Sequence, residues 1–263
     1  MTNSASDPAA ATASSDVHID VRDVTLQHGD RVIQRDLNFA IKRGDIFVIM
    51  GGSGCGKSTL LKHMIGLYEP AAGEILIDGQ NFFGAEPDVQ LQMRRHWGIT
   101  YQLGGLFSDM TLAENVALPL QQYTALEWDE IRDLAAYKLA LVGLAGFEDF
   151  HPAAISGGMQ KRAALARAIA LDPELLFFDE PSAGLDPLSS QRLDELILEI
   201  RESMGATVVI VTHELASIFA IANNAVFLDA ETKTQLDYGP PRELLHNSEH
   251  EIVRRFLARG EIA

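Results

Sequence analysis

The chain has 263 residues, of which 47% are hydrophobic and 7% aromatic, and its formal net charge is −16 at pH 7. This composition is that of a folded globular protein of one large or two small domains, and no apolar run approaches the ~18 residues that would indicate a membrane span. The acidic balance argues against a protein that binds a nucleic-acid duplex, because such proteins gain affinity from a basic face that neutralises phosphates.

The cellular compartment is indicated by the amino terminus and by the cysteine content. The amino terminus has neither a basic stretch nor an apolar core, so we expect no secretory signal. The single cysteine, Cys55, cannot form an internal disulfide, which fits a reducing compartment. We therefore expect the chain to stay in the cytoplasm and to reach any membrane through a partner protein.

The first part of the chain predicts a tail followed by strands and one helix. Residues 1–16 are small and polar, and we expect them to be disordered. Residues 17–38 alternate between apolar and polar side chains, which is typical of strands with one buried face. The stretch RGDIFVIM, residues 43–50, predicts a turn and a short apolar strand, and a helix should follow over about residues 57–66. The stretch GEILIDGQN, residues 73–81, reads as another strand with turns at both ends.

The rest of the chain predicts helices and then a strand, a helix and a strand. Apolar residues fall at helical spacing over about residues 88–165, so we expect a mostly helical insert there. Two strongly apolar strands follow, ELLFFD at 174–179 and TVVIVTH at 207–213, and residues 187–204 between them predict an amphipathic helix. This order implies a right-handed crossover and a parallel sheet. Residues 249–260 predict a last, small amphipathic helix.

A phosphate-binding loop lies between the first apolar strand and the first helix. The stretch GGSGCGKS satisfies the pattern G-x-x-x-x-G-K-[ST] in full. Glycines let the backbone curl so that successive N–H groups point at phosphate oxygens, Lys57 places a positive charge on the β and γ phosphates, and the Ser58 hydroxyl can ligate Mg²⁺. The alternative is a glycine-rich turn that only starts a helix. The predicted nucleotide contacts are Gly51, Gly52, Ser53, Gly54, Cys55, Gly56, Lys57, Ser58 and Thr59.

Further strand ends carry polar side chains suited to hydrolysis at such a loop. The buried strand LLFFDE ends in Asp179 and Glu180. Adjacent strand residues point to opposite sides, so Asp179 can hold the Mg²⁺ shell while Glu180 orients or deprotonates the attacking water. Alone, this pair would equally well be a solvated acidic strand end. His213 ends TVVIVTH within reach of the γ-phosphate and the water, and Gln102 ends GITYQ, where it can contact Mg²⁺ or water.

A second loop, ISGGM at residues 155–159, also starts a predicted helix. A helix start of this kind can hold an anion on its backbone N–H groups. The alternative is a tight turn in which Ser156 caps the helix, and both can hold at once. The chain already has one phosphate-binding loop, so the presence of a second anion-binding loop requires an explanation.

The motifs occur in an order that resembles the ABC-type ATPases, the nucleotide-binding subunits of ABC transporters. The match covers about residues 17–239. The resemblance implies an α/β phosphate-loop NTPase fold with a mainly parallel central sheet, an antiparallel β subdomain and a helical subdomain. In family order the motifs are the phosphate loop Gly51–Ser58, the Q-loop residue Gln102, the signature ISGGM, the acidic strand Leu175–Asp179 with Glu180, the D-loop SAGLD with Asp186, and the switch histidine His213.

The resemblance implies ATP and Mg²⁺ as ligands and assigns a role to each motif. It places Glu180, His213 and Gln102 in hydrolysis, and it places Ser58, Gln102 and Asp179 around the metal ion. The family often stacks an aromatic residue on adenine, and the matching position here is near His28. A histidine can still stack on a base, but less broadly.

The same resemblance implies a reason for the second loop. In this family two subunits pack head to tail, and each ATP lies between the phosphate loop of one chain and the signature of the other. The contacts in trans would be Ser156, Gly157, Gly158 and Met159, where Met159 stands in place of the usual glutamine. We therefore expect a homodimer of ATPase subunits held together by ATP.

Three domains are predicted on this basis. They are a disordered tail at residues 1–16, an ABC ATPase domain at 17–242 with its helical subdomain at about 88–165, and a C-terminal helical extension at 243–263.

Two longer stretches, residues 101–120 and 156–187, resemble a narrower family. This family comprises the ATPases of the bacterial Mla phospholipid system and of related toluene-tolerance and Mce-type transporters. The resemblance implies a peripheral subunit on the cytoplasmic side of the inner membrane that powers phospholipid transport between the inner and outer membranes. It implies as partners a membrane permease, an MCE-domain protein and a small STAS-domain protein, with no nucleic acid.

Residues 104–107 follow the Q-loop, where ABC subunits receive the coupling helix of the permease. Leu106 and Phe107 are either exposed parts of that socket or core residues of the helical insert. The C-terminal stretch EIVRRFLARG either docks a partner or caps the domain.

Other functions compete with this reading. The chain could drive an importer of another solute, or it could be a non-transport ABC ATPase of translation or DNA repair. Such non-transport proteins usually carry two cassettes in one chain or a long coiled-coil insert, and this sequence has neither. A phosphate-loop kinase for small molecules would need an acceptor pocket and no SGG loop.

Overall fold

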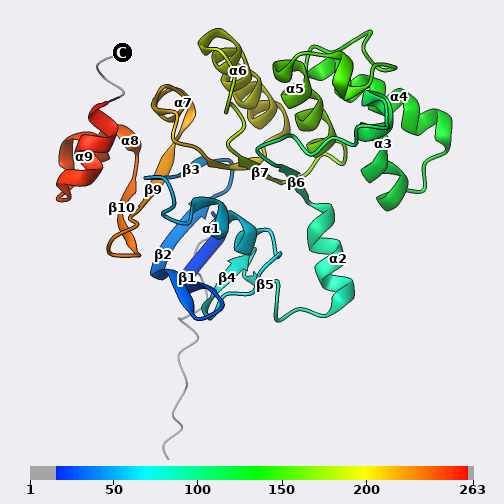
Figure 1. The fold of residues 1–263 in the computed structure, drawn as a ribbon. Coiled ribbons are helices and arrows are strands. Elements are labelled where there is room, and N and C mark those ends of the chain that lie inside the picture. Colours follow the sequence, from blue (N-terminus) through cyan, green and yellow to red (C-terminus); the bar gives the residue numbers. More distant parts are fainter. Residues whose placement is uncertain (1–15, 260–263) are drawn as a thin grey trace, which may run out of the picture.

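The computed structural model describes residues 16–259. The predicted disordered tail, residues 1–16, therefore lies outside the described residues except for Asp16, and so do the last four residues of the predicted extension 243–263. Two sheets and a set of helices make up the described part of the chain (Figure 1).

The central sheet, within the described residues, has the strand order β10-β9-β3-β8-β7-β6. Its strands from β9 to β6 are parallel, and β10 is antiparallel to β9. Every residue of β3, β7 and β8 is buried, as expected for parallel strands covered on both faces. The predicted parallel pairing across the helix between β7 and β8 is confirmed. The strands are β3 (Ile46–Gly51), β6 (Trp97–Thr100), β7 (Leu175–Asp179), β8 (Thr207–Val211), β9 (Asn224–Leu228) and β10 (Gln235–Gly239).

The register of the parallel strands brings the motifs to one edge of the sheet. Val211 of β8 pairs with Ile49 of β3 on one side and with Asp179 of β7 on the other. The segments that follow these three strands therefore leave the sheet side by side. In open α/β sheets this carboxyl edge is where ligands bind.

A second, antiparallel sheet has the order β2-β1-β4-β5. Residues of β1 and β2 alternate between buried and exposed, which confirms the predicted strands with one buried face. This face shares a hydrophobic cluster with helix α1 (Lys57–Met64) and with one face of the central sheet. The strands are β1 (Val17–His28), β2 (Arg31–Lys42), β4 (Ala72–Ile77) and β5 (Gln80–Asn81).

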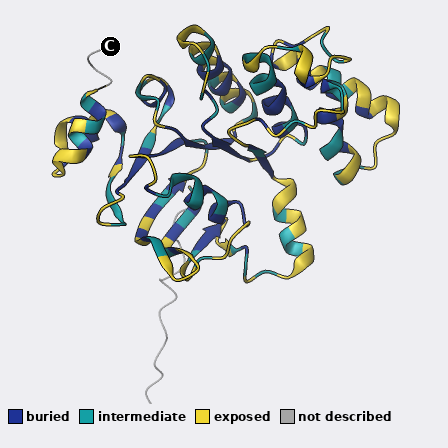
Figure 2. Ribbon diagram, viewed as in Figure 1, coloured by how far each residue is buried: buried dark blue, intermediate teal, exposed yellow. Residues whose placement is uncertain are grey.

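The other face of the central sheet is covered by helices. A single buried cluster joins this face to residues of α3, α4, α5, α6 and α7, and Figure 2 shows the buried side of these helices in dark blue. Helix α2, by contrast, has no buried residue. The helices are α2 (Pro87–Arg95), α3 (Leu112–Tyr123), α4 (Trp128–Leu141), the 3₁₀ turn η1 (Pro152–Ala154), α5 (Gly157–Ala168), α6 (Pro187–Met204) and α7 (Leu215–Ile221).

The predicted, mostly helical range 88–165 also contains a strand. Strand β6 lies inside it and pairs in parallel with β7, so part of this range belongs to the central sheet. This confirms the strand predicted from GITYQ, which ends at Thr100, two residues before Gln102. Helix α5 also continues past the predicted limit to Ala168.

The C-terminal helix predicted over residues 249–260 is present as α9 (Glu251–Ala258). Its Val253 and Leu257 are fully buried in the cluster of the central sheet, and Phe256 packs edge-on against Phe227 of β9. The preceding helix α8 (Pro241–Asn247) spans the predicted domain boundary at 242/243. These contacts support the reading in which the extension caps the domain.

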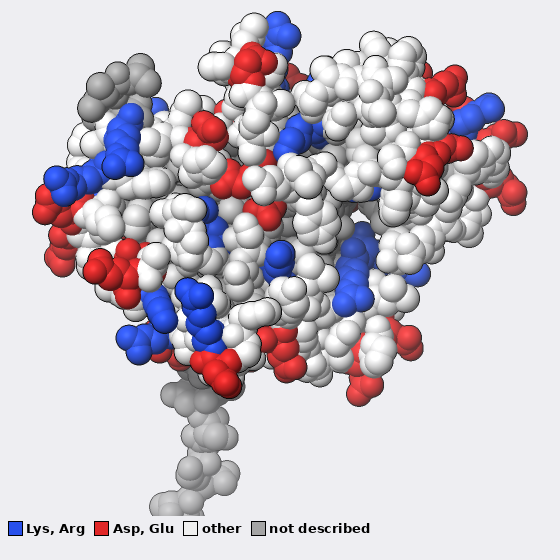
Figure 3. All heavy atoms as spheres, viewed as in Figure 1, with Lys and Arg blue, Asp and Glu red and all other residues white. Residues whose placement is uncertain are grey.

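On the face drawn in Figure 3, Lys and Arg side chains are interspersed with Asp and Glu side chains and form no continuous basic stripe. Within residues 16–259, no helix has both the length and the apolar character that crossing a membrane requires.

Candidate functional site

The phosphate-binding loop connects β3 to α1 in a conformation that only glycine tolerates. Gly51 has φ 145°, and a Cβ there would lie 2.2 Å from the carbonyl oxygen of Leu228. Gly54 and Gly56 also have positive φ, at 74° and 99°. A Cβ on Gly56 would lie 2.7 Å from a methyl group of Ile33. The loop therefore curls against β9 and the antiparallel sheet.

Lys57 and Ser58 follow the loop at the start of α1. The Lys57 ammonium donates to the carbonyl oxygens of Gly51 and Gly52, at 3.0 Å each, and so spans the mouth of the loop. The Ser58 hydroxyl donates to Asp179 Oδ1 at 2.9 Å. A hydroxyl and a carboxylate side by side are the hard oxygen ligands that Mg²⁺ prefers, so the residues fit that ion.

Glu180 and His213 form a pair on the same edge of the sheet. Glu180 Oε1 lies 2.8 Å from His213 Nδ1, and the other carboxylate oxygen, Oε2, is buried with no hydrogen-bond partner among the described residues. The side chain of Glu180 is 11% exposed, whereas that of His213 is 60% exposed. The two adjacent carboxylates therefore have different partners, as the strand pattern predicted: Asp179 faces Ser58 and Glu180 faces His213.

Gln102 lies in the exposed loop after β6. Its backbone carbonyl accepts a hydrogen bond from Lys161 of α5, and the same ammonium lies 3.4 Å from the carbonyl oxygen of Glu180. Burial lowers the pKa of Lys161, an effect that Glu180 and Asp179 oppose. The sequence reasoning missed Lys161. The sequence carried one signal for it, because Lys161 lies two positions after the SGGM loop, near the start of the helix that follows.

Gln34 is a second residue that the sequence reasoning missed. It lies in β2, is fully buried, and its amide nitrogen donates to the carbonyl oxygens of Cys55 at 2.6 Å and of Asp229 at 2.8 Å. Gln34 thus joins the antiparallel sheet, the phosphate-binding loop and the turn after β9. Cys55 is itself buried, and this burial raises the pKa of its thiol.

The second loop has the geometry of a capped helix start. Ser156 is the N-cap of α5, and its hydroxyl accepts from the Met159 N–H at 3.3 Å. Open space surrounds Gly157, and a Cβ on Gly158 would be 3.7 Å from Leu185. The cap reading is confirmed, and the glycines leave room for an external group to approach the first N–H groups of the helix.

Asp186 of the D-loop caps α6. Its carboxylate accepts from the N–H groups of Leu188 and Ser189 at 3.1 and 3.0 Å, and from the Ser189 hydroxyl at 2.5 Å. The hydrogen bond from the hydroxyl is the main cause that lowers the pKa of Asp186. His28 is exposed at the end of β1, where it pairs with Arg31 across the hairpin, and its contact with adenine stays a prediction.

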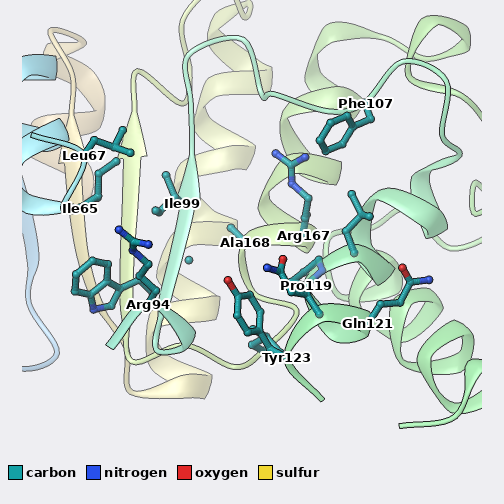
Figure 4. Close-up of a pocket in the computed structure, with 15 residues that line it drawn as sticks. Ile65, Leu67, Arg94, Ile99, Phe107, Pro119, Gln121, Tyr123, Arg167 and Ala168 are labelled. Carbon is teal, nitrogen blue, oxygen red and sulfur yellow. The ribbon is translucent and has the colours of Figure 1, made fainter. Parts of the chain in front are cut away.

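A groove of about 760 Å³ lies beside the loop that carries Gln102. Ile65, Leu67 and Ile99 line it from the sheet side, and Pro119 and Tyr123 of α3 line it from the helical side (Figure 4). Arg94 and Gln121 add polar groups to an otherwise largely apolar wall.

Phe107 and Arg167 lie at the end of this groove nearest the Q-loop (Figure 4). The Arg167 guanidinium donates to the carbonyl oxygens of Gly105 at 2.8 Å and Gly104 at 3.1 Å. Phe107 is 56% exposed, whereas Leu106 is half-buried and packs against the core. Phe107 is therefore free to contact a partner, and Leu106 is a core residue.

Several known proteins are similar to this chain. A family model described as "ABC transporter" matches residues 34–183. The "Intermembrane phospholipid transport system ATP-binding protein MlaF" of Haemophilus influenzae is 41% identical over 243 residues, which are 92% of this chain and 90% of that protein. MlaF of Escherichia coli is 39% identical over 91% of this chain and 88% of its own length.

A further relative has a different name. The "Probable ribonucleotide transport ATP-binding protein mkl" of Mycobacterium tuberculosis is 41% identical over 241 residues, which are 92% of this chain. These residues span 66% of mkl, so about a third of that protein has no counterpart here.

Solved structures show the same fold. The cassette MJ0796, in a dimeric post-hydrolysis state bound to ADP and phosphate, matches with a TM-score of 0.76 and 30% identity over 84% of this chain and 98% of that chain. The cbiO1 protein of Clostridium perfringens, part of the ABC transporter complex cbiONQ, matches with a TM-score of 0.80 and 28% identity over 94% and 99%. The predicted α/β phosphate-loop fold and the predicted resemblance are both confirmed, and the chain belongs to the ABC transporter family.

Proposed function

We propose that the chain is the ATP-hydrolysing subunit of a bacterial transporter that moves phospholipid between the inner and outer membranes. The observation that carries this proposal is the alignment with the MlaF proteins, which extends over 88–90% of their length at 39–41% identity. A match that spans both chains covers the groove as well as the nucleotide site. It therefore relates the whole cassette to the MlaF proteins and not only its common ATP-binding core.

ATP is proposed to bind on the loop from Gly51 to Thr59, with its phosphates on the loop N–H groups and on the Lys57 ammonium. The exposed His28 is proposed to contact the base. Ser58 and Asp179, with Gln102, are the proposed ligands of Mg²⁺, which supplies charge neutralisation for the transferred phosphoryl group. The hydrogen bond from Ser58 to Asp179 supports this assignment, because it holds two oxygen ligands together beside the loop.

Glu180 is proposed to orient and deprotonate the attacking water. Its contact with His213 at 2.8 Å fixes one carboxylate oxygen, and its buried Oε2 is left to accept a hydrogen bond from a water molecule. An unpartnered buried carboxylate oxygen is costly, and a water in front of the γ-phosphate would satisfy it. His213 would then hold Glu180 in place and contact the γ-phosphate.

The signature residues Ser156, Gly157, Gly158 and Met159 are proposed to bind the ATP of a second copy of the chain, with Asp186 at the same interface. Two observations support this. A Cβ added to Gly157 would meet no atom within 4 Å, so an external group has room beside the start of α5, and a cassette of the same fold is dimeric in its ADP-and-phosphate state.

The groove beside the Q-loop is the proposed seat of the membrane permease. It is largely apolar, it is 760 Å³ in volume, and the exposed Phe107 lies at its edge. Through the permease the subunit would lie on the cytoplasmic side of the inner membrane, in one complex with an MCE-domain protein and a small STAS-domain protein.

A second cargo is suggested by the name of mkl, which refers to ribonucleotide transport. The phospholipid reading is favoured because the chain covers nearly all of MlaF but only 66% of mkl. An importer of another solute and a non-transport ATPase are the remaining alternatives.

The test uses the complex of this chain with its permease, purified and reconstituted into proteoliposomes. We expect ATP-dependent transfer of a fluorescent phospholipid, and loss of transfer in the Glu180→Gln complex. If ribonucleotides stimulate ATP hydrolysis and no phospholipid is transferred, the cargo would instead be a ribonucleotide. If the chain does not co-purify with a permease, this result would favour the alternative of a non-transport ATPase.

A further inference from the structure

A cluster of histidine and carboxylate side chains lies where the antiparallel sheet meets the amino ends of β6 and β7. His18 comes from β1, Asp78 from the turn between β4 and β5, and Glu174 immediately precedes β7. One ligand atom from each of the three lies within 4.8 Å of the others. The three residues line a pocket of about 230 Å³. This pocket is at the end of the sheet opposite to the phosphate-binding loop.

His18 is a buried imidazole that uses only one of its nitrogens. Its side chain is 2% exposed, and Nδ1 lies 2.7 Å from the hydroxyl of Thr207. Its other nitrogen, Nε2, lies 3.7 Å from Asp78 Oδ2, which is too far for a hydrogen bond. Within residues 16–259, Nε2 therefore has no hydrogen-bond partner. In proteins, an imidazole that ligates a metal through one nitrogen is usually oriented by a hydrogen bond at the other nitrogen. His18 has this arrangement, because Thr207 holds Nδ1 and Nε2 faces the carboxylates.

The charges around the pocket also suit a cation. The carboxylates of Asp78 and Glu174 both face the Arg43 guanidinium, which pairs with Asp78 and lies 3.6 Å from Glu174. His96 lies on the other side of Glu174, at 3.5 Å. Burial lowers the pKa of His18, and Arg43 adds to this effect while Asp78 and Glu174 oppose it.

We propose that His18 Nε2, Asp78 and Glu174 form a binding site for a divalent transition metal of the Zn²⁺ type, which takes the place of the Arg43 guanidinium. A site of one imidazole and two carboxylates suits Zn²⁺ better than Mg²⁺ or Ca²⁺, which prefer oxygen ligands alone. Zinc bonds of about 2.0–2.2 Å require the ligand atoms to close by roughly 1 Å. Asp78 and Glu174 are 41% and 55% exposed and are free to make this movement.

The metal would join the two sheets. Asp78 belongs to the antiparallel sheet, Glu174 leads into the central sheet, and the Thr207 that supports His18 starts β8. A metal that binds only the folded chain stabilises it. The ATP site, at the other edge of the sheet, is left unchanged.

The test is a titration of the full-length chain, stripped of metal with a chelator and returned to chelator-free buffer. Zn²⁺ binding is measured by calorimetry, and Co²⁺ binding by the visible absorption of a four-coordinate site. We expect one site, a raised melting temperature, and a loss of affinity of more than about tenfold in His18→Gln and in Glu174→Gln. His151→Gln, which replaces an exposed histidine far from the pocket in sequence, is the matched control.

Two more variants test the details. Thr207→Val removes the support of His18 and should weaken binding by about tenfold, while Arg43→Gln removes the competing cation and should strengthen it. The proposal is overturned if the wild-type chain binds no Zn²⁺ or Co²⁺ at micromolar concentrations, or if His18→Gln, folded by circular dichroism, binds as the wild type does. Weaker binding in Arg43→Gln would also contradict it.

Discussion

At the scale of single residues, the site depends on backbone conformation as well as on side-chain identity. Glu180 has φ 49°, a left-handed conformation that costs a non-glycine residue about 1–3 kcal/mol. It is held there by the hydrogen bond from its N–H to the Val211 carbonyl at 2.8 Å and by the contact with His213. In this conformation the Glu180 carboxylate contacts His213, whereas that of Asp179 contacts Ser58.

A glutamine at position 180 tests the role of the carboxylate. Glu180→Gln should lower kcat for ATP hydrolysis by about 10²–10⁴-fold, the usual contribution of a general base. Binding of ATP should persist, because the phosphate-binding loop does not contact this side chain. Steady-state hydrolysis and equilibrium nucleotide binding measure the two effects. A variant with near wild-type kcat would show that Glu180 is not the general base.

Lys161 is expected to act as a positioning residue, since its ammonium holds the carbonyls of Gln102 and Glu180. Lys161→Met should lower kcat by about tenfold or more, because a hydrogen bond from a charged group contributes about 1.5–3 kcal/mol. The Kd for ATP should change little, and Lys161→Arg should restore part of the rate. Equal losses in the Met and Arg variants, or a loss confined to ATP binding, would contradict this role.

At the scale of elements, helix α5 connects three parts of the site. Its first turn carries the N–H groups that we propose bind the ATP of a second copy, Lys161 reaches the edge that holds Glu180, and Arg167 near its end holds the loop beside the groove. A rigid helix that touches all three can transmit a movement between them. This is a structural basis for coupling ATP binding to a partner in the groove.

The packing of α6 against α7 predicts a pH dependence of stability. Burial raises the pKa of Asp194 to about 6, while its hydrogen bond from Ser217 at 2.7 Å acts in the opposite direction. Between about pH 4 and 6 the native state keeps a proton that the unfolded state releases, so this group's contribution to stability falls as pH rises through that interval.

Asp194→Asn should remove this dependence, because an amide can still accept from Ser217 and does not ionise. At pH 8 we expect the variant to be more stable than the wild type by about 1–3 kcal/mol, and at pH 4 the difference should nearly vanish. Urea unfolding at the two pH values measures it. A gain of equal size at both pH values would show that ionisation is not the cause.

At the scale of the whole molecule, each chain holds only part of the proposed ATP site. The phosphate-binding loop and Glu180 lie on the edge of the central sheet, while the second loop lies at the start of α5. Two chains with a net charge of −16 each repel one another. ATP bound between them would therefore be needed to hold the interface.

The Glu180→Gln chain should be a monomer without nucleotide and a dimer with ATP and Mg²⁺, as measured by size-exclusion chromatography with light scattering. Adding Ser156→Arg should abolish the dimer while leaving ATP binding to the monomer intact, because the arginine fills the space that the second copy's ATP would occupy. Ser203→Arg, at the far end of α6, is a control that should still dimerise. A dimer that survives Ser156→Arg would limit the second loop to its role as a helix cap.

Much of the fold and the motif set could be predicted from the sequence. Glycine spacing, the apolar strands and the carboxylates at their ends are local patterns with local causes, and they indicated the phosphate-binding loop, the parallel pairing of β7 with β8 and the different partners of Asp179 and Glu180. The strand that ends near Gln102 was also indicated, whereas the segments β9, β10, α7 and α8 were not predicted, because a few residues carry too little periodicity to separate a strand from a helix.

The contacts that complete the site were decided only by the tertiary structure. Gln34 lies 195 residues from Asp229, and Lys161 lies 59 residues from Gln102, so no sequence pattern links either pair. The same holds for His18 and Thr207, which are 189 residues apart. Spacing along the chain determines local geometry, whereas hydrogen bonds between distant segments form only once the packing of the two sheets and the helices has brought those segments together.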